Sequence, residues 1–388
     1  MENNENRRKR SQRRQLYNIL TYVFCGIIFL FSIISIVIPD KSYSEEENRV
    51  LTEFPDISWS NIMDVSFMTG LENYVSDHFW ARDLWISMKV KCDRLLGKTE
   101  FNGVYLCDDH YLVQVPTEPD EENVERNLVA IKQFAEKHTE LDMDMLIIPN
   151  AITTMKDSLP IGAPARDQEK DAKKIEDAVG QKIEYHDVTK TLRKHADEGM
   201  YYKTDHHWTS KAAYYTFLDV AEGLDIEDPI KKYNVYTVTS DFSGTLASKS
   251  GYHKEKDSIE VYEPLGIEND YIVTDSSGNE PRTTVYAKEA LEEKDKYQVF
   301  FHGNQSRVTI NTLNETKERL LIFKDSYANC FVPFLIPYYN EIIMVDPRYY
   351  YDDVQTLIER ERITDVLFLY NMDTFLTDRS IADTLVVE

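Results

Sequence analysis

The sequence predicts an α/β domain with a mostly parallel sheet and a β-rich insertion, preceded by one transmembrane helix. Residues 17–38 form an apolar run without charged side chains. In the middle of the chain and near its C-terminus, short apolar segments alternate with stretches of helical spacing, which is typical of parallel strands joined by crossover helices. Between these two sets, residues 225–310 contain short segments rich in β-branched and aromatic residues, which we interpret as an insertion.

The first element is a membrane anchor, Tyr17 to Ile38, which is 22 residues long. As a helix it would span roughly 33 Å, against about 30 Å of hydrocarbon. The basic tail before it, residues 1–16, contains six Lys or Arg residues. By the positive-inside rule the tail lies in the cytoplasm and the remainder lies outside. We therefore expect a single-pass protein of the cell membrane whose main domain is extracellular.

A cleaved signal peptide is the alternative for this segment. Such peptides have an apolar region of about 7–15 residues followed by a small-residue cleavage site. Here the run is longer and continues directly into Pro39 and Asp40, without such a site. The sequence favours an uncleaved anchor, followed by a polar stalk at residues 39–57 and a domain at residues 58–388.

The charge distribution excludes some classes of partner. The first 38 residues contain six basic and two acidic side chains, which leaves 38 basic and 66 acidic residues, a net charge of −28, for the rest. A field of this sign repels nucleic acid and anionic lipid. We expect a neutral or locally screened substrate.

The four cysteines form no disulfide framework, and no C-x-x-C motif is present. Cys25 lies in the anchor. Cys92 and Cys107 could pair outside the cell, or they could be small buried apolar residues together with Cys330. Spacing alone leaves this open.

The expected elements of the domain follow in order. Residues 58–98 and the stretch from Val124 to Ala135 have helical spacing, and a short hairpin from Gly103 to Val113 lies between them. A buried strand at Met145–Ile148, a helix at 166–179 and a strand at Ile183–Val188 come next. In the C-terminal set, strands at Leu320–Phe323, Ile342–Val345 and Val366–Leu369 are separated by helices at about 327–337 and 351–362.

The densest polar cluster runs from Tyr201 to Thr209 and contains Asp205, His206 and His207. It directly precedes an amphipathic helix, which Thr209 or Ser210 could cap. An Asp-x-His segment at such a junction can place an acid beside a base. The acid then fixes the imidazole tautomer, and the other ring nitrogen faces the reacting group.

The second cluster is Lys324-Asp325-Ser326-Tyr327, which follows a buried strand and precedes a helical stretch. This is the setting of a nucleophile elbow, although the chain has no G-x-S-x-G motif. Backbone N–H groups of the helix start could stabilise an oxyanion at such a serine.

Each cluster has other interpretations. The Asp-His-His segment could be a surface loop or a buried pair, and the serine could be only a helix cap. A metal site formed by Asp205, His206 and His207 is weakly supported, because no H-x-x-x-H and no further histidine lie nearby. We therefore predict no metal.

Together the clusters resemble the DHHW family, which is similar to the SGNH-hydrolase-like proteins of alginate acetylation such as AlgX and AlgJ. The similarity covers about residues 45–380. The segments that carry it are Tyr201–Thr209, Glu47-Asn48-Arg49, Phe242–Leu246, Gly303-Asn304, Lys324–Tyr327 and Asp346–Tyr350. The resemblance implies a three-layer α/β/α fold of the SGNH-hydrolase type, although here Asp and His precede Ser, whereas many SGNH hydrolases have Ser first.

By the same resemblance, Asp205 orients, His207 is the general base and Ser326 is the nucleophile of an O-acetyltransferase acting on envelope or secreted polysaccharide. Further candidates for oxyanion or substrate binding are Gly303, Asn304, Arg348, Tyr327 and Trp208. Gly303 and Asn304 could instead form a structural turn, and Arg348 a salt bridge. The mechanism uses no cofactor. In the relatives a multispan membrane acyltransferase supplies acetyl groups, so such a partner is implied here.

Two functions therefore remain open. The first is an anchored O-acetyltransferase, or an acetylesterase if water takes the acyl group. The second is a non-catalytic carbohydrate-binding or envelope scaffold protein with the same fold, for which 25 tyrosines would suit sugar stacking. Loss of acetyl-ester turnover in Ser326→Ala and His207→Ala separates them.

Overall fold

The structure is a computed structural model that describes all residues except 1, 45, 48, 267–269, 279 and 386–388. The chain divides into two compact units, Met1–Leu96 and Gly97–Glu388. The start of the extracytoplasmic domain at residue 58 stays a prediction. Residues 58–96 form helices that bury little: α2 and α3 have no buried residue and α4 has only Val90. Asn48, part of one family match, lies outside the described residues.

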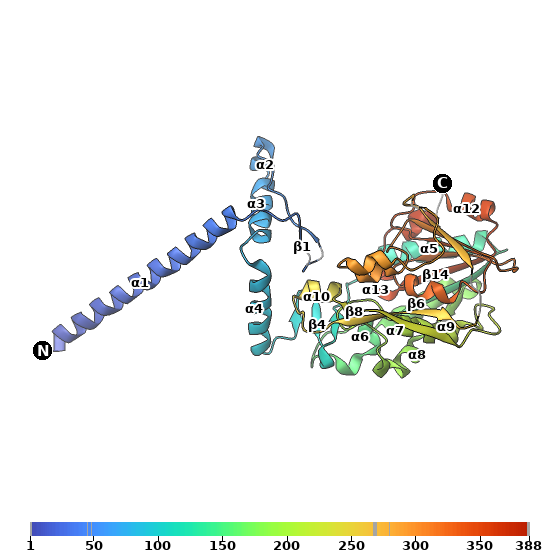
Figure 1. The fold of residues 1–388 in the computed structure, drawn as a ribbon, viewed down its shortest axis with the longest axis horizontal. Helices are drawn as coiled ribbons and strands as arrows, with labels where there is room; N and C mark the ends of the chain where they lie inside the picture. The colour runs from blue at the N-terminus through green and yellow to red at the C-terminus, as the bar shows by residue number, and fades with distance from the viewer. Residues whose placement is uncertain (1, 45, 48, 267–269, 279, 386–388) are drawn as a thin grey trace. The chain divides into compact units, whose positions relative to one another are not determined.

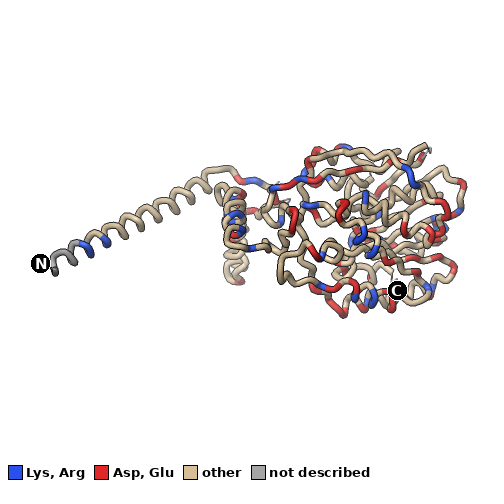
Figure 2. The backbone as a smooth tube through the Cα atoms, turned by 90° about the horizontal axis from the view of Figure 1, so that it is seen from below, with Lys and Arg blue, Asp and Glu red and all other residues tan. Residues whose placement is uncertain are grey.

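The first unit contains a long helix and three short ones. Its elements are α1 (Glu2–Val37), β1 (Tyr43–Ser44), β2 (Arg49–Val50), α2 (Trp59–Met63), α3 (Ser66–Asp77) and α4 (Arg82–Leu95). Within α1, the 26 residues Gln12–Val37 are long and apolar enough to cross a membrane, and no other described helix is. Figure 2 shows basic residues near the start of α1 and an uncharged stretch after them.

The second unit is built on a seven-stranded sheet in the order β10-β11-β13-β12-β14-β6-β7. Figure 1 labels two of its adjacent strands, β6 and β14. The five strands from β13 to β7 are parallel, and β10 and β11 extend the sheet antiparallel at one edge. The strands are β6 (Asp142–Ile148), β7 (Glu184–His186), β10 (Tyr271–Asp275), β11 (Arg307–Thr312), β12 (Arg319–Lys324), β13 (Glu341–Val345) and β14 (Asp365–Asn371).

Alternation along the strands creates two hydrophobic cores, one on each face of the sheet. In β12, Leu320 and Ile322 belong to one core, whereas Leu321 and Phe323 belong to the other. The first core is shared with α8 (Thr189–Lys194), α9 (Ser210–Val220) and α11 (Ala328–Phe331). The second is shared with α5 (Glu121–Lys137), α7 (Gln168–Val179), α12 (Val354–Glu361), α13 (Met372–Thr377) and α14 (Ile381–Leu385). The predicted three-layer α/β/α architecture with a mostly parallel sheet is confirmed.

Two smaller sheets and two short helices complete this unit. They are β3 (Glu100–Phe101), β4 (Val104–Leu106) and β5 (Leu112–Gln114); β8 (Tyr233–Phe242) and β9 (Asp257–Pro264); and the helices α6 (Ala151–Thr154) and α10 (Thr245–Ser250). Residues 225–310 are thus only partly an insertion: β8 and β9 pair with each other, but β10 and β11 belong to the main sheet.

Two predicted elements differ in detail. The helix expected at 327–337 is α11 followed by one 3-10 turn, Val332–Phe334. Pro333 has no N–H to continue an α-helix, which accounts for the change. Within the segment 225–310, which was expected to be rich in strands, Lys296–Val299 is a 3-10 turn. All four cysteines are free; Cys92 is exposed and Cys107 is buried.

Candidate active site

The loop that carries the Asp-His-His segment is closed by a bridge between Tyr201 and Trp208. Asp257, the first residue of β9, holds this loop in place. Its carboxylate accepts hydrogen bonds from the backbone N–H groups of Lys203 and Thr204, both at 2.8 Å, and from the Thr204 hydroxyl at 2.6 Å. Because these contacts hold the backbone before residue 205, the following side chains have little freedom to turn away.

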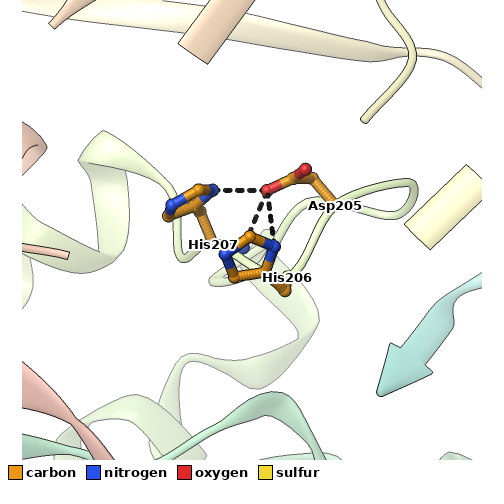
Figure 3. A group of neighbouring side chains, drawn as sticks. All are labelled: Asp205, His206 and His207. Carbon is orange, nitrogen blue, oxygen red and sulfur yellow. Dashed lines mark hydrogen bonds and ion pairs between the residues drawn. The ribbon is translucent and has the colours of Figure 1, made fainter. Parts of the chain in front are cut away.

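Asp205 is almost fully buried, with 2% of its surface exposed, and its carboxylate accepts four hydrogen bonds. Oδ1 accepts from His207 N at 3.0 Å and from His207 Nδ1 at 2.5 Å (Figure 3). Oδ2 accepts from the backbone N–H of Thr245 at 2.7 Å and from its hydroxyl at 2.9 Å. Any side chain at Gly244 would collide with this carboxylate, so the sequence around residue 244 is fitted to the site.

The electrostatics keep Asp205 ionised. Burial alone would raise the pKa of its carboxyl group, but the two neighbouring histidines and the hydrogen bonds outweigh burial and hold that pKa well below its usual range. A carboxylate has no proton to donate, so His207 Nδ1 carries the proton of the contact between them. His207 Nε2 is then the unprotonated nitrogen.

Ser326 lies at the end of β12 and is partly exposed, although its neighbours Asp325 and Tyr327 are fully buried. Its Oγ is 2.8 Å from His207 Nε2. With Nε2 as acceptor, the hydroxyl group donates this hydrogen bond. The structure therefore brings Asp205, His207 and Ser326 together in a continuous line of hydrogen bonds, with the serine at the surface.

The turn after β12 is held by the Asp325 carboxylate. Oδ1 accepts from the backbone N–H of Tyr327 at 2.8 Å, and Oδ2 accepts from the backbone and side-chain amides of Asn371, at 2.8 and 2.5 Å. Asn371 is the last residue of β14, so Asp325 ties the serine turn to the neighbouring strand.

Tyr297 packs against the site and was not predicted from the sequence. Its ring stacks on the His207 imidazole with centroids 3.7 Å apart and an angle of 12° between planes. Its hydroxyl group donates to the carbonyl oxygen of Ser326 at 3.2 Å. The His206 ring lies 3.9 Å from that of His207, with an angle of 36° between the ring planes. No motif marks Tyr297, one of 25 tyrosines, so only the fold reveals it.

Trp208 and Tyr327, which were expected near substrate, are fully buried in the structure. Trp208 Nε1 donates to the Tyr327 carbonyl oxygen at 3.0 Å, and the Tyr327 hydroxyl donates to the His206 carbonyl oxygen at 2.6 Å. Their rings stack with centroids 5.6 Å apart. They join the histidine loop to the serine turn, and no substrate can reach them in this arrangement.

Gly303 and Asn304 form a turn beside the serine turn. Gly303 has φ of +82°, a left-handed conformation that favours glycine. Asn304 is exposed, and its Oδ1 accepts from Lys324 Nζ at 2.9 Å and from Asn329 Nδ2 at 3.2 Å. Because the oxygen is held inward, the Asn304 amide NH₂ is left available. Burial lowers the pKa of Lys324 to about 8.

Arg348 forms an ion pair with Asp346 by two hydrogen bonds, from Nε at 2.8 Å and from Nη2 at 2.6 Å. Asp346 is fully buried and the Arg348 side chain is partly exposed. Burial would lower the pKa of Arg348, but the Asp346 carboxylate raises it above its usual range. The salt bridge is thus formed, and the exposed part of the guanidinium remains near the surface.

Asp205, His206 and His207 each place one potential ligand atom within 4.8 Å of the others, as a metal site would require. Both histidine Nδ1 atoms are already engaged, His207 with Asp205 at 2.5 Å and His206 with the Thr245 hydroxyl at 2.8 Å. Binding of a metal through these Nδ1 atoms would break both hydrogen bonds and release the fixed tautomer of His207. The geometry favours the hydrogen-bonded triad.

The fold is shared with several solved structures. A DHHW family protein from Eubacterium siraeum DSM 15702 has a TM-score of 0.64 and 24% identity, covering 74% of this chain and 98% of that chain. Bacillus cereus PatB1, solved with a sulfonyl adduct, has a TM-score of 0.59 and 19% identity, covering 72% and 96%. The O-acetyltransferase domain of Pseudomonas putida AlgJ is more distant, with a TM-score of 0.45, 13% identity and coverage of 73% and 98%.

A comparison with curated protein sequences gives no match. Residues 108–345 match the family described as DHHW protein. The match covers more than half of the chain and includes both the Asp-His-His segment and the serine turn. The chain therefore belongs to the DHHW family.

Proposed function

We propose that this protein is a membrane-anchored O-acetyltransferase that modifies a polysaccharide of the cell envelope or a secreted polysaccharide. The observation that carries the proposal is the contact of 2.8 Å between His207 Nε2 and Ser326 Oγ, with Asp205 bound to the opposite ring nitrogen at 2.5 Å. A serine whose proton can pass to a fixed imidazole is an activated nucleophile.

In the first half-reaction, Ser326 Oγ attacks the carbonyl carbon of an acetyl donor while His207 Nε2 accepts the hydroxyl proton. The tetrahedral intermediate then breaks its bond to the leaving group, which takes the proton from His207. This produces acetyl-Ser326. Asp205 stabilises the transient imidazolium and keeps its tautomer.

In the second half-reaction, a sugar hydroxyl gives its proton to His207 and its oxygen attacks acetyl-Ser326. Collapse of the second intermediate returns the proton to Ser326 Oγ and releases the acetylated sugar. If water replaces the sugar, the same residues perform ester hydrolysis. Transfer therefore depends on the site binding the sugar hydroxyl in place of water.

The oxyanion of both intermediates needs hydrogen-bond donors. The free amide NH₂ of Asn304 is the donor we assign to this role, with Gly303 shaping its turn. Lys324 and Asn329 support the assignment because they occupy the Asn304 oxygen and so leave its NH₂ outward. Preorganised donors of this kind contribute about 2.7–4 kcal/mol each to transition-state stabilisation.

The anchor gives the proposed topology. The basic tail at residues 1–16 would stay in the cytoplasm, residues 17–38 would cross the membrane, and residues 39–57 would form a stalk that holds the domain outside. Acetyl groups are made available inside the cell, so a multispan membrane acyltransferase is the partner that would deliver them. The strongly negative domain fits a neutral polysaccharide acceptor better than a polyanion.

The test is turnover of an acetyl ester by the full chain, with and without a neutral oligosaccharide acceptor. Wild-type protein should release the leaving group and produce acetylated oligosaccharide detected by mass spectrometry. Ser326→Ala and His207→Ala should each lose about 10⁴-fold or more in kcat while their thermal unfolding stays cooperative. Oligosaccharide binding without any turnover by folded wild-type protein would refute the enzyme and leave the scaffold function.

A further inference from the structure

A pocket of about 150 Å³ lies beside the triad. Its walls come from β5, from α6 after β6, from the end of β14 and the start of α13, from α10 and from the Asp205–His206 segment. We name it the His206 pocket. Strands β12, β14 and β6 are adjacent and parallel, so their C-terminal ends share one edge of the sheet. Strands are about 4.8 Å apart, which places the pocket one to two spacings, about 5–10 Å, from Ser326.

The hydrogen bonds determine which ring nitrogen of His206 carries the proton. The Thr245 hydroxyl donates to the ionised Asp205 carboxylate at 2.9 Å, so its oxygen is free only to accept from His206 Nδ1 at 2.8 Å. Nδ1 therefore holds the proton. Burial and the neighbouring His207 lower the pKa of His206 to about 4, so the ring is neutral at pH 7.

His206 Nε2 is consequently an unprotonated acceptor, and it has no partner among the residues that the structure describes. His206 is among the residues that line the pocket, whereas His207 is not. The second histidine of the motif thus faces the serine, and the first presents an acceptor to the neighbouring space.

The pocket offers both acceptors and donors. Gln114 Nε2 donates one N–H to Asp373 Oδ2 at 3.2 Å, which leaves its second N–H and the Gln114 carbonyl oxygen without a partner among the described residues. Asp373 Oδ1 accepts from the backbone N–H of Thr117 at 2.9 Å, and its carboxylate retains further lone pairs. Leu246 provides one of the apolar walls. A ligand that fits must offer several donors, an apolar face and no negative charge.

We propose that the His206 pocket is a binding subsite for a neutral sugar residue of the acceptor polysaccharide, in which His206 Nε2 accepts a hydrogen bond from a ring hydroxyl group. A sugar ring has the required hydroxyl donors and apolar C–H face. The identity of the ligand as an acceptor rests on the proposed transferase function, but its binding requires no turnover. A chain that extends from this pocket toward Ser326 would place a nearby sugar hydroxyl at the acetylated serine.

The test measures binding in Ser326→Ala full-length protein in detergent, so that no reaction occurs. Tetramers of β-linked glucose and of β-linked N-acetylglucosamine are titrated by calorimetry. In this background His206→Leu should weaken binding between about 2-fold and 12-fold, the loss expected for one neutral hydrogen bond. Gln114→Leu should have an effect in the same range, and His206→Gln, which keeps an acceptor, should change binding less than 2-fold.

His195→Leu is the matched control, because His195 does not line the pocket and instead stacks on Tyr215, with ring centroids 3.9 Å apart. Oligosaccharide binding by this variant should equal that of the parent. Absence of binding by the parent would overturn the subsite. Binding by His206→Leu and Gln114→Leu that is as tight as binding by the parent would also overturn it. Acetyl turnover by the wild type with unchanged binding in these variants would overturn the subsite alone. Binding that depends on His206 without turnover would instead overturn the transferase function.

Discussion

Replacing Tyr297 separates the contribution of its ring from that of its hydroxyl group. The ring lies 3.7 Å from the His207 imidazole, and the hydroxyl donates to the Ser326 carbonyl oxygen at 3.2 Å. Tyr297→Phe removes this hydrogen bond and the weak contact of the hydroxyl with the Cys330 thiol. The Ser326 oxygen still accepts from the Asn329 N–H at 3.2 Å, so it is not left unsatisfied. We therefore expect the low end of a hydrogen bond's contribution, about 0.5 kcal/mol, or a 2-fold loss in kcat/KM.

Tyr297→Leu removes the ring as well. The imidazole becomes positively charged during proton transfer, and an aromatic face beside a desolvated cation contributes about 0.5–2 kcal/mol. Loss of the aromatic pair adds about 0.5–1.5 kcal/mol. Together we expect about 1–3.5 kcal/mol, a loss of roughly 5-fold to 370-fold in kcat/KM.

The assay is kcat/KM for an acetyl ester in both variants, with unfolding measured in urea to confirm a native fold. Tyr286→Phe is the matched control, because this half-buried tyrosine donates to the Tyr262 carbonyl oxygen at 3.0 Å and has no hydrogen bond to the triad. Its rate should equal that of the wild type. Equal rates for folded Tyr297→Leu and Tyr297→Phe would refute a role for the stacked ring.

Three further changes have defined outcomes. Asp205→Asn should lower kcat about 10⁴-fold, because an amide cannot fix the same imidazole tautomer, and a loss under 10-fold would contradict the orienting role. Asp325→Ala leaves three buried N–H groups, that of Tyr327 and the backbone and side-chain groups of Asn371, without this acceptor and should cost about 3–9 kcal/mol of unfolding free energy, whereas Asp325→Asn should cost less. The pKa of His206, about 4 when folded, lies below its unfolded value of about 6.5, so the unfolded chain binds more protons between these values. The free energy of unfolding should therefore fall as pH drops from 6.5 to 4, and it should fall less steeply in His206→Gln. The same pH dependence of the urea unfolding midpoint in the wild type and in His206→Gln would contradict this.

The sheet was predictable because its central strands are buried on both faces and therefore appear as continuous apolar runs. Strands at 320–323, 342–345 and 366–369 lie within β12, β13 and β14. The edge strands were harder to assign. β10 and β11 have exposed positions and resemble the separate β8–β9 pair in composition, so periodicity could not show that they join the main sheet.

For the site, His207 and Ser326 could be placed from the sequence on segments next to helices and strands. The residues that hold these two side chains in position could not be identified. Asp257 and Tyr297 lie in segments without a polar motif, and each acts through contacts with residues more than 25 positions away. Trp208 and Tyr327 belong to the motifs, yet burial gives them a structural role that the residue types alone do not reveal. Long-range packing decides all four positions.

The most direct test of the central claim is covalent labelling of the full chain with a sulfonyl fluoride, a reagent class that adds to activated hydroxyl groups, followed by peptide mass spectrometry. We predict a single adduct on Ser326 in the wild type, none in Ser326→Ala, and labelling slowed by orders of magnitude in His207→Ala. An adduct on another residue, or equal labelling of wild-type and His207→Ala protein, would contradict activation of Ser326 by His207.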